Sequence, residues 1–155
     1  MNCGRVLSNL FVGPTPMDDD DFRELKSLNI TAILSLQTED DESAAAIEHE
    51  RITAIAVDMS FTNLPVADFD RLELVRKLPD CVSVVERLLA AGDILYLHCT
   101  AGVNRSPTVA VAYLHWCLRW PLKRAVQHIQ NCRNCCPDED AIRQASRIRN
   151  RKRSG

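Results

Sequence analysis

Ile94-Leu-Tyr-Leu-His-Cys-Thr-Ala-Gly-Val-Asn-Arg-Ser106 is the stretch from which the fold of this 155-residue chain can be worked out. Residues 94–97 are wholly apolar, which predicts a short central strand. A loop of small residues with Gly102 follows, and residues 105–118 are apolar nearly all round, which predicts a buried helix. Backbone N–H groups of such a loop converge on the positive end of the helix. We therefore expect a concave cradle for an oxyanion such as phosphate or sulfate.

Outward from this stretch, apolar segments alternate with amphipathic ones. We predict further strands at 6–12, 30–36 and 52–57, with an irregular segment at 59–69. Helices are predicted at 18–28, 42–50, 70–91, 122–132 and 138–149. Strands alternating with helices indicate an α/β fold, here a single-domain three-layer sandwich with a mainly parallel central sheet flanked by helices. We expect the domain to cover residues 1–149 and to be followed by a basic tail at 150–155.

Composition excludes several classes of protein. Apolar residues make up 46% and charged residues 26% of the chain, which excludes a disordered or low-complexity protein. No run of about 18 apolar residues is present for a membrane span, and no signal peptide is evident, so we expect a cytoplasmic protein. A net charge of −2 argues against a general nucleic-acid binder. The charge is uneven, because residues 1–80 carry 7 basic and 16 acidic side chains.

The loop after residue 97 holds the residues with reactive chemistry. Cys99 lies at the base of the cradle, where the loop dipoles and the Arg105 guanidinium favour thiolate over thiol. Arg105 is planar and can hold two oxygens of a phosphoryl group. His98 is placed to support the loop backbone. Ser106 is placed to donate a hydrogen bond from its hydroxyl to the Cys99 sulfur, which would help this sulfur to leave in a second reaction step. The cradle itself would be formed by the remaining loop residues, Thr100, Ala101, Gly102, Val103 and Asn104.

His98-Cys-Thr-Ala-Gly-Val-Asn-Arg-Ser106 resembles the His-Cys-x-x-Gly-x-x-Arg-Ser signature of cysteine-dependent protein tyrosine and dual-specificity phosphatases. The resemblance implies hydrolysis of phosphate monoesters through a cysteinyl-phosphate, with no cofactor and no metal. It also implies an aspartate general acid about 30 residues before the cysteine. Asp68 and Asp70 both qualify. Asp70 suits a helix N-cap, so we expect Asp68 to be the acid.

The substrate is less well defined than the reaction. The uncharged loop argues against a heavily phosphorylated ligand, and we expect first a dual-specificity protein phosphatase acting on phosphoproteins. A phosphoglucan phosphatase is the first alternative, because residues 36–37, 68–70, 99–102 and 141–143 resemble segments of plant glucan phosphatases. That family usually has glycine where Asn104 stands. Phe69 would then be a sugar-stacking residue of the binding site, although a core position for Phe69 is equally compatible with the pattern.

The loop sequence is also compatible with substrates and functions of different kinds. Cys99-Thr100 with Asn104-Arg105 resembles the loop of RNA 5′-triphosphatases. A phosphorylated lipid head group is a third candidate substrate, although the sequence has no anchor or amphipathic basic helix for it. A non-catalytic phosphate-binding module or a sulfurtransferase would use a similar loop without the hydrolytic reaction.

The cysteine content adds one more candidate site. Seven cysteines without an export signal indicate free thiols in a reducing compartment. Cys132, Cys135 and Cys136 with His128 have ligand-like spacing for zinc, or they are small fillers at the end of a helix.

Overall fold

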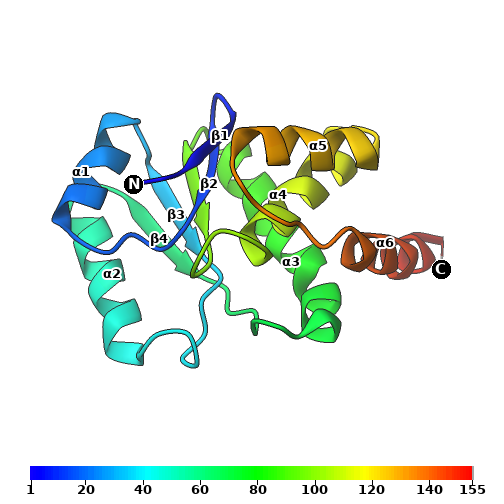
Figure 1. Ribbon diagram of the computed structural model, residues 1–155, viewed down its shortest axis with the longest axis horizontal. Helices are drawn as coiled ribbons and strands as arrows, with labels where there is room; N and C mark the ends of the chain where they lie inside the picture. Colours follow the sequence, from blue (N-terminus) through cyan, green and yellow to red (C-terminus); the bar gives the residue numbers. More distant parts are fainter. Residues whose placement is uncertain (155) are drawn as a thin grey trace.

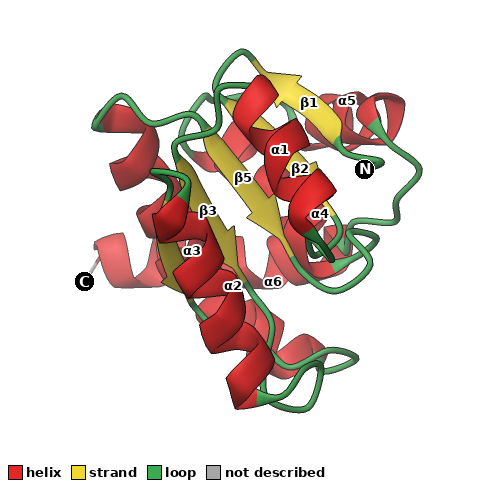
Figure 2. Ribbon diagram, turned by 90° about the vertical axis from the view of Figure 1, so that its left-hand side faces the viewer, coloured by secondary structure: helices red, strands yellow, loops and turns green. Residues whose placement is uncertain are grey.

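The computed structural model describes residues 1–154, and within them a mixed five-stranded sheet forms the centre of the fold (Figures 1 and 2). The strand order is β1-β2-β5-β3-β4. All neighbouring strands pair in parallel except β1 and β2, which form an antiparallel hairpin. The strands are β1 (Gly4–Leu7), β2 (Leu10–Gly13), β3 (Ala32–Ser35), β4 (Ser60–Asn63) and β5 (Leu95–His98).

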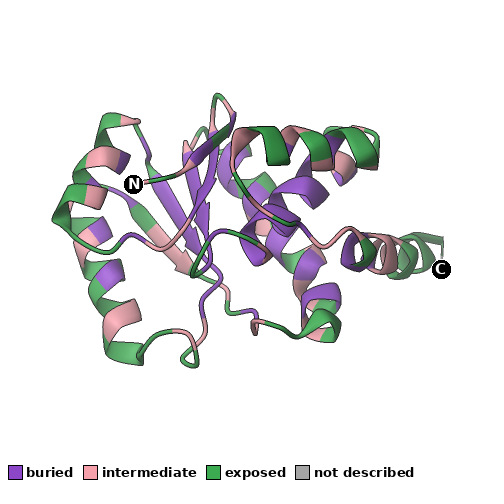
Figure 3. Ribbon diagram, in the orientation of Figure 1, coloured by how far each residue is buried: buried purple, intermediate pink, exposed green. Residues whose placement is uncertain are grey.

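Helices cover both faces of the sheet (Figure 1). One face carries α1 (Asp19–Ser27) and α2 (Ala44–Ala56), and the other carries α3 (Arg71–Ala90), α4 (Arg105–Trp116), α5 (Leu122–Cys132) and α6 (Glu139–Ser154). Two apolar clusters fill the spaces between these layers, and the purple ribbons of Figure 3 show that β5 and α4 are buried almost throughout. The predicted α/β sandwich with a mainly parallel sheet is confirmed.

The structure differs from the prediction at two of the predicted strands, since one is a hairpin of two strands and the other belongs to a helix. Residues 6–12 form the hairpin of β1 and β2, which turns at Ser8 and Asn9. Residues 52–57, rich in β-branched side chains, mostly belong to α2, whose N-cap Ser43 accepts a hydrogen bond from the Ala46 N–H. Strand propensity is a weak preference, and a capped helix that buries Ala54 on the sheet outweighs it. The strand that follows β3 along the chain is instead β4, which lies inside the segment predicted to be irregular.

The C-terminal boundary also differs from the expectation. Helix α6 continues to Ser154, so residues 150–154 of the predicted tail extend a regular helix that starts in the domain. Residue 155 lies outside the described residues. Within residues 1–154, no helix has both the length and the apolar character that crossing a membrane requires.

Candidate active site

The carboxyl ends of the three central parallel strands meet at one edge of the sheet, where β5 leads through residues 99–104 into α4. Gly102 shapes this loop. Its φ is +68°, and a Cβ atom there would lie 2.4 Å from the carbonyl carbon of Gly13 at the end of β2. Only glycine satisfies both the left-handed backbone and this close approach. The loop is therefore packed directly on the neighbouring strand.

Cys99 is buried at the base of this loop, and its Sγ lies 3.3 Å from Ser106 Oγ in the first turn of α4. The positive end of α4 and the Arg105 guanidinium both lie beside this sulfur. The hydroxyl of Ser106, itself fully buried, is within reach to donate to that sulfur. Burial inside α3 raises the pKa of the Cys81 thiol to about 12.

His98 supports the loop from below. Its ring is fully buried, with Nδ1 2.9 Å from the carbonyl oxygen of Cys99 and Nε2 2.5 Å from Oε1 of Glu50 in α2. A ring held at both nitrogens cannot rotate freely, so it fixes the direction of the Cys99 carbonyl. The structure thus adds Glu50 as a partner of the predicted loop-supporting histidine.

Arg105 is held in place by a carboxylate that lies 64 residues earlier in the chain. Its Nη1 and Nη2 donate to Asp41 over 2.7 and 2.9 Å, and Nη1 also donates to the carbonyl oxygen of Val66 over 2.9 Å. Burial alone would raise the pKa of Asp41, but hydrogen bonds from Arg105 and from the Thr38 N–H, with the Arg105 charge, lower it to about 2. Nε of Arg105 donates to no group within residues 1–154, so it can donate to a bound oxyanion.

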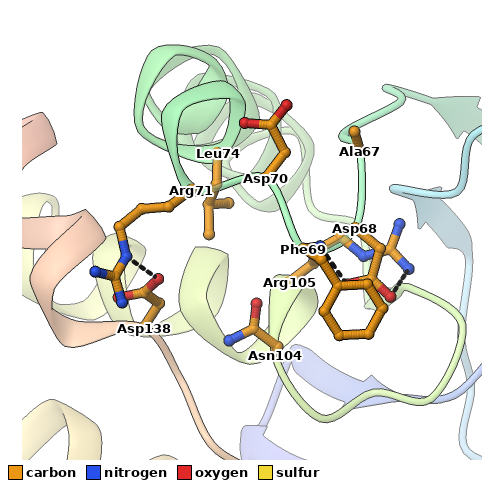
Figure 4. Close-up of a pocket in the computed structure, with 9 residues that line it drawn as sticks. All are labelled: Ala67, Asp68, Phe69, Asp70, Arg71, Leu74, Asn104, Arg105 and Asp138. Atoms are coloured by element: carbon orange, nitrogen blue, oxygen red, sulfur yellow. Dashed lines mark hydrogen bonds and ion pairs between the residues drawn. The ribbon is translucent and has the colours of Figure 1, made fainter.

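Asp68 lies beside Arg105. Its Oδ2 is 3.3 Å from Arg105 Nη2, and the side chain is 32% exposed (Figure 4). Asp70 instead accepts a hydrogen bond from the Glu73 N–H over 3.0 Å and caps α3. The geometry therefore places Asp68 beside Arg105 and gives Asp70 a structural role.

The loop of residues 65–70, which carries Asp68, is held by two side chains of α3. Glu73 accepts a hydrogen bond from the Ala67 N–H over 2.6 Å, and Lys77 donates to the Pro65 carbonyl oxygen over 2.6 Å. Glu73 and Lys77 also pair with each other at 2.8 Å. This arrangement fixes the backbone on which Asp68 stands.

Phe69 is completely exposed and has a φ of +57°, a conformation that bulky side chains rarely adopt. The alternative of a core position is therefore wrong. Phe69 borders a pocket of about 390 Å³ with Leu74, Asn104 and Asp138 (Figure 4). A phenyl ring exposed at a strained position beside Asp68 is a feature that packing does not explain.

The remaining predicted loop residues have distinct positions. Thr100 Oγ1 accepts hydrogen bonds from Gln37 Nε2 over 3.1 Å and from Arg105 Nη2 over 3.3 Å. Ala101 and Val103 are exposed, and the carbonyl oxygen of Ala101 accepts from Arg133 over 3.3 Å. The structure thus brings residues 98–106 together at one edge of the sheet, with Asp68 and Phe69 beside Asn104 and Arg105.

Asp41, Glu50 and Glu73 were not identified from the sequence as parts of the site. Asp41 and Glu50 follow β3 in a loop and a helix, and their partners are far away along the chain. A local signal existed only for Glu73, because Asp70 and Glu73 have the spacing of a helix capping box.

The cysteine group beside His128 lacks the arrangement of a metal site. Cys132 Sγ lies 3.8 Å from His128 Nε2, which contacts the carbonyl oxygen of Val6 at 2.8 Å. Burial raises the pKa of both Cys132 and Cys135. Across residues 1–154, no three His, Cys, Asp or Glu side chains are grouped as ligands for a metal ion.

Residues 11–150 match the family described as the dual specificity phosphatase catalytic domain. The chain is 30% identical to the phosphoglucan phosphatase LSF1 of Arabidopsis thaliana over 144 residues, which are 92% of this chain and 24% of that protein. It is also 30% identical to the phosphoglucan phosphatase DSP4 of Castanea sativa over 150 residues, which are 94% of this chain and 40% of that protein. The chain thus spans less than half the length of either relative.

A solved structure shares the fold. The crystal structure of PTPMT1 in complex with PI(5)P superposes with a TM-score of 0.76 and 18% sequence identity. The match covers 98% of this chain and 99% of that chain. At this level of identity, the similarity concerns the fold alone.

Proposed function

The chain belongs to the dual-specificity phosphatase family, and from that premise we propose that it hydrolyses phosphate monoesters through a cysteinyl-phosphate, with phosphorylated glucan as its substrate. The observation that supports this chemistry is that Cys99, Arg105 and Asp68 lie together at the loop of residues 99–104, where Cys99 contacts Ser106 and Arg105 pairs with Asp68. The observation that carries the substrate class is the complete exposure of Phe69 beside Asp68.

In the first step, the Cys99 thiolate attacks phosphorus as the bond from phosphorus to the leaving oxygen breaks. Loop N–H groups and Arg105 hold the three equatorial oxygens, whose charge is spread in the transition state. Asp68 gives its proton to the leaving oxygen, which would otherwise depart as an alkoxide. The products are the free alcohol and a phosphate bonded to Cys99 Sγ.

In the second step, water attacks the same phosphorus on the side that the alcohol has left. Asp68, now a carboxylate, accepts a proton from this water and returns to its initial state. Ser106 donates a hydrogen bond to the sulfur, 3.3 Å away, as the bond from phosphorus to sulfur breaks. Inorganic phosphate is released and the thiolate is restored.

Two considerations place a glucan first among the substrates. An exposed aromatic ring can stack on the apolar face of a sugar ring, and Phe69 stands next to the acid that protonates the leaving oxygen. The two plant relatives described above are named phosphoglucan phosphatases. We therefore place phosphoglucan ahead of the phosphoprotein substrate expected from the sequence.

A dual-specificity protein phosphatase is the second candidate, and one feature favours it. A pocket of about 300 Å³ on the Thr15 side of the loop is lined by Asp18, Asp19, Glu42 and Glu50. Gln37 also lines it and donates to Thr100 of the phosphate loop. Carboxylates at this place would suit a basic side chain next to a phosphorylated residue in a peptide.

Phosphate release from phosphorylated amylopectin and from a phosphotyrosine peptide, measured side by side, tests both candidates. We expect a higher kcat/KM on amylopectin, and a preference for the peptide would favour the protein phosphatase. The Cys99→Ser variant is the blank, since it keeps the loop but lacks the thiolate. Equal release by wild type and Cys99→Ser would contradict the enzymatic function and favour a binding module. A cytoplasmic location stays a prediction.

A further inference from the structure

Asn104 is the loop residue whose side chain bonds to the segment after α5. It stands directly before Arg105 and lines the pocket of about 390 Å³ that also contains Phe69. The mechanism above uses the backbone of this position and leaves its amide group unassigned.

The orientation of this amide is determined by the segment after α5. Asn104 Nδ2 donates to the carbonyl oxygen of Cys136 over 3.0 Å, and the Cys136 N–H donates back to the carbonyl oxygen of Val103 over 2.7 Å. A carbonyl oxygen only accepts hydrogen bonds, so the nitrogen of the amide must face Cys136. The oxygen, Oδ1, then points away from the Cys136 carbonyl oxygen.

The backbone of Asn104 is fixed as well. Thr108 Oγ1 donates to the Asn104 carbonyl oxygen over 2.7 Å, and Thr108 Oγ1 accepts from the Asp138 N–H over 2.8 Å. The residue is thus held at both its main chain and its side chain. A group held in this way can recognise a ligand with little loss of conformational entropy.

Figure 4 shows the oxygen of Asn104 directed into the pocket, toward the space bounded by Leu74 and Phe69. Within residues 1–154, Oδ1 accepts no hydrogen bond. The pocket thus offers an apolar wall at Leu74, an exposed ring at Phe69 and an uncharged acceptor between them.

We propose that Asn104 is a specificity-determining residue, whose Oδ1 accepts a hydrogen bond from a hydroxyl group of the sugar that carries the phosphate. The inference rests on the proposed phosphoglucan activity. A sugar hydroxyl supplies the donor that Oδ1 lacks, while the ring of the same sugar contacts Phe69. The amide is also uncharged, so it does not repel the phosphate as a carboxylate at this position would.

The test compares wild type with Asn104→Ala, using phosphorylated amylopectin and p-nitrophenyl phosphate. The second substrate has a leaving group without sugar hydroxyls. The quantity measured is the ratio of kcat/KM on amylopectin to kcat/KM on p-nitrophenyl phosphate. We expect Asn104→Ala to lower this ratio about tenfold, the size of effect typical of one lost hydrogen bond. The matched control is Asn134→Ala, since Asn134 is exposed and lies outside the pocket, and this control should keep the wild-type ratio.

An unchanged ratio in Asn104→Ala would overturn the inference, because it would show that the amide affects both substrates alike or neither. This result differs from failure of the proposed function. A wild-type protein that hydrolyses p-nitrophenyl phosphate but releases nothing from amylopectin would contradict the proposed substrate itself.

Discussion

Both oxygens of the Asp41 carboxylate accept hydrogen bonds from the buried Arg105 guanidinium, at 2.7 and 2.9 Å, and the Asp41 side chain is only 10% exposed. Asp41 therefore uses one edge of the guanidinium and holds its plane in a fixed direction. An arginine that is already oriented can bind phosphate without first losing side-chain freedom.

The Asp41–Arg105 pair predicts a specific dependence of stability on pH. The pKa of Asp41 is lowered from 3.8 to about 2 in the folded protein. A lowered pKa contributes stability that is present above the unfolded-state pKa and is lost as the pH falls toward 2. We expect Asp41→Asn to lower the free energy of unfolding by about 2 kcal/mol at pH 7, and by progressively less below pH 4.

Denaturant unfolding of both proteins from about pH 2.5 to about pH 7 measures this difference, because that range spans the unfolded-state pKa of 3.8 and approaches the folded-state value of about 2. Glu48→Gln is the control, because Glu48 pairs with Arg51 on the exposed surface of α2 and should contribute much less. A difference between wild type and Asp41→Asn that grows toward low pH would contradict the assigned pairing.

Asp68 and Asp70 are expected to give opposite phenotypes. Asp68→Ala removes the proposed proton donor, so kcat/KM on phosphorylated amylopectin should fall by about 10²- to 10⁴-fold while stability changes little. Asp70→Ala removes the N-cap of α3 and should lower the free energy of unfolding by about 1 kcal/mol. Kinetics and denaturant unfolding of the two variants, run in parallel, separate these roles. If Asp70→Ala loses more activity than Asp68→Ala, then the acid is Asp70.

Gly102 and Gly92 provide a matched test of the loop. Both have positive φ, but a Cβ at Gly92 meets nothing within 4 Å, whereas one at Gly102 would collide with Gly13. We expect Gly92→Ala to be destabilised by about 1 kcal/mol from backbone strain alone. Gly102→Ala should be destabilised by about 3 kcal/mol or more and should lose its affinity for tungstate, an analogue of phosphate. Thermal unfolding and tungstate inhibition measure these effects, and equal behaviour of the two variants would show that the collision is relieved.

The fold was predictable to the extent that its signals are local. The apolar run before His98, the glycine in the loop and the buried helix after Arg105 are neighbours in sequence, so their order determines one strand, one turn and one helix. The segment 52–57 was misassigned because its β-branched residues favour a strand locally, while the cap at Ser43 and the packing of Ala54 favour a helix.

The site was predictable only where its residues belong to one loop. Cys99, Arg105 and Ser106 occur within eight residues and share one structural context. Asp41 lies in the loop after β3 and contacts Arg105, and Glu50 lies in α2 and contacts His98. No spacing in the sequence indicates either contact. Such contacts depend on the packing of distant elements, which periodicity does not encode.

Phe69 is expected to distinguish sugar from peptide substrates. Its ring makes no core contact and is completely exposed, so Phe69→Ala should leave the free energy of unfolding within about 0.5 kcal/mol of wild type. Loss of the stacking surface should lower kcat/KM on phosphorylated amylopectin by about fivefold to tenfold, which corresponds to roughly 1 kcal/mol of aromatic contact. Kinetics on amylopectin and on a phosphotyrosine peptide provide the comparison. Leu72→Ala is the matched control, because Leu72 is also exposed and lies three residues away on α3. A larger loss on the peptide than on amylopectin would assign the ring to protein recognition and support the second candidate function.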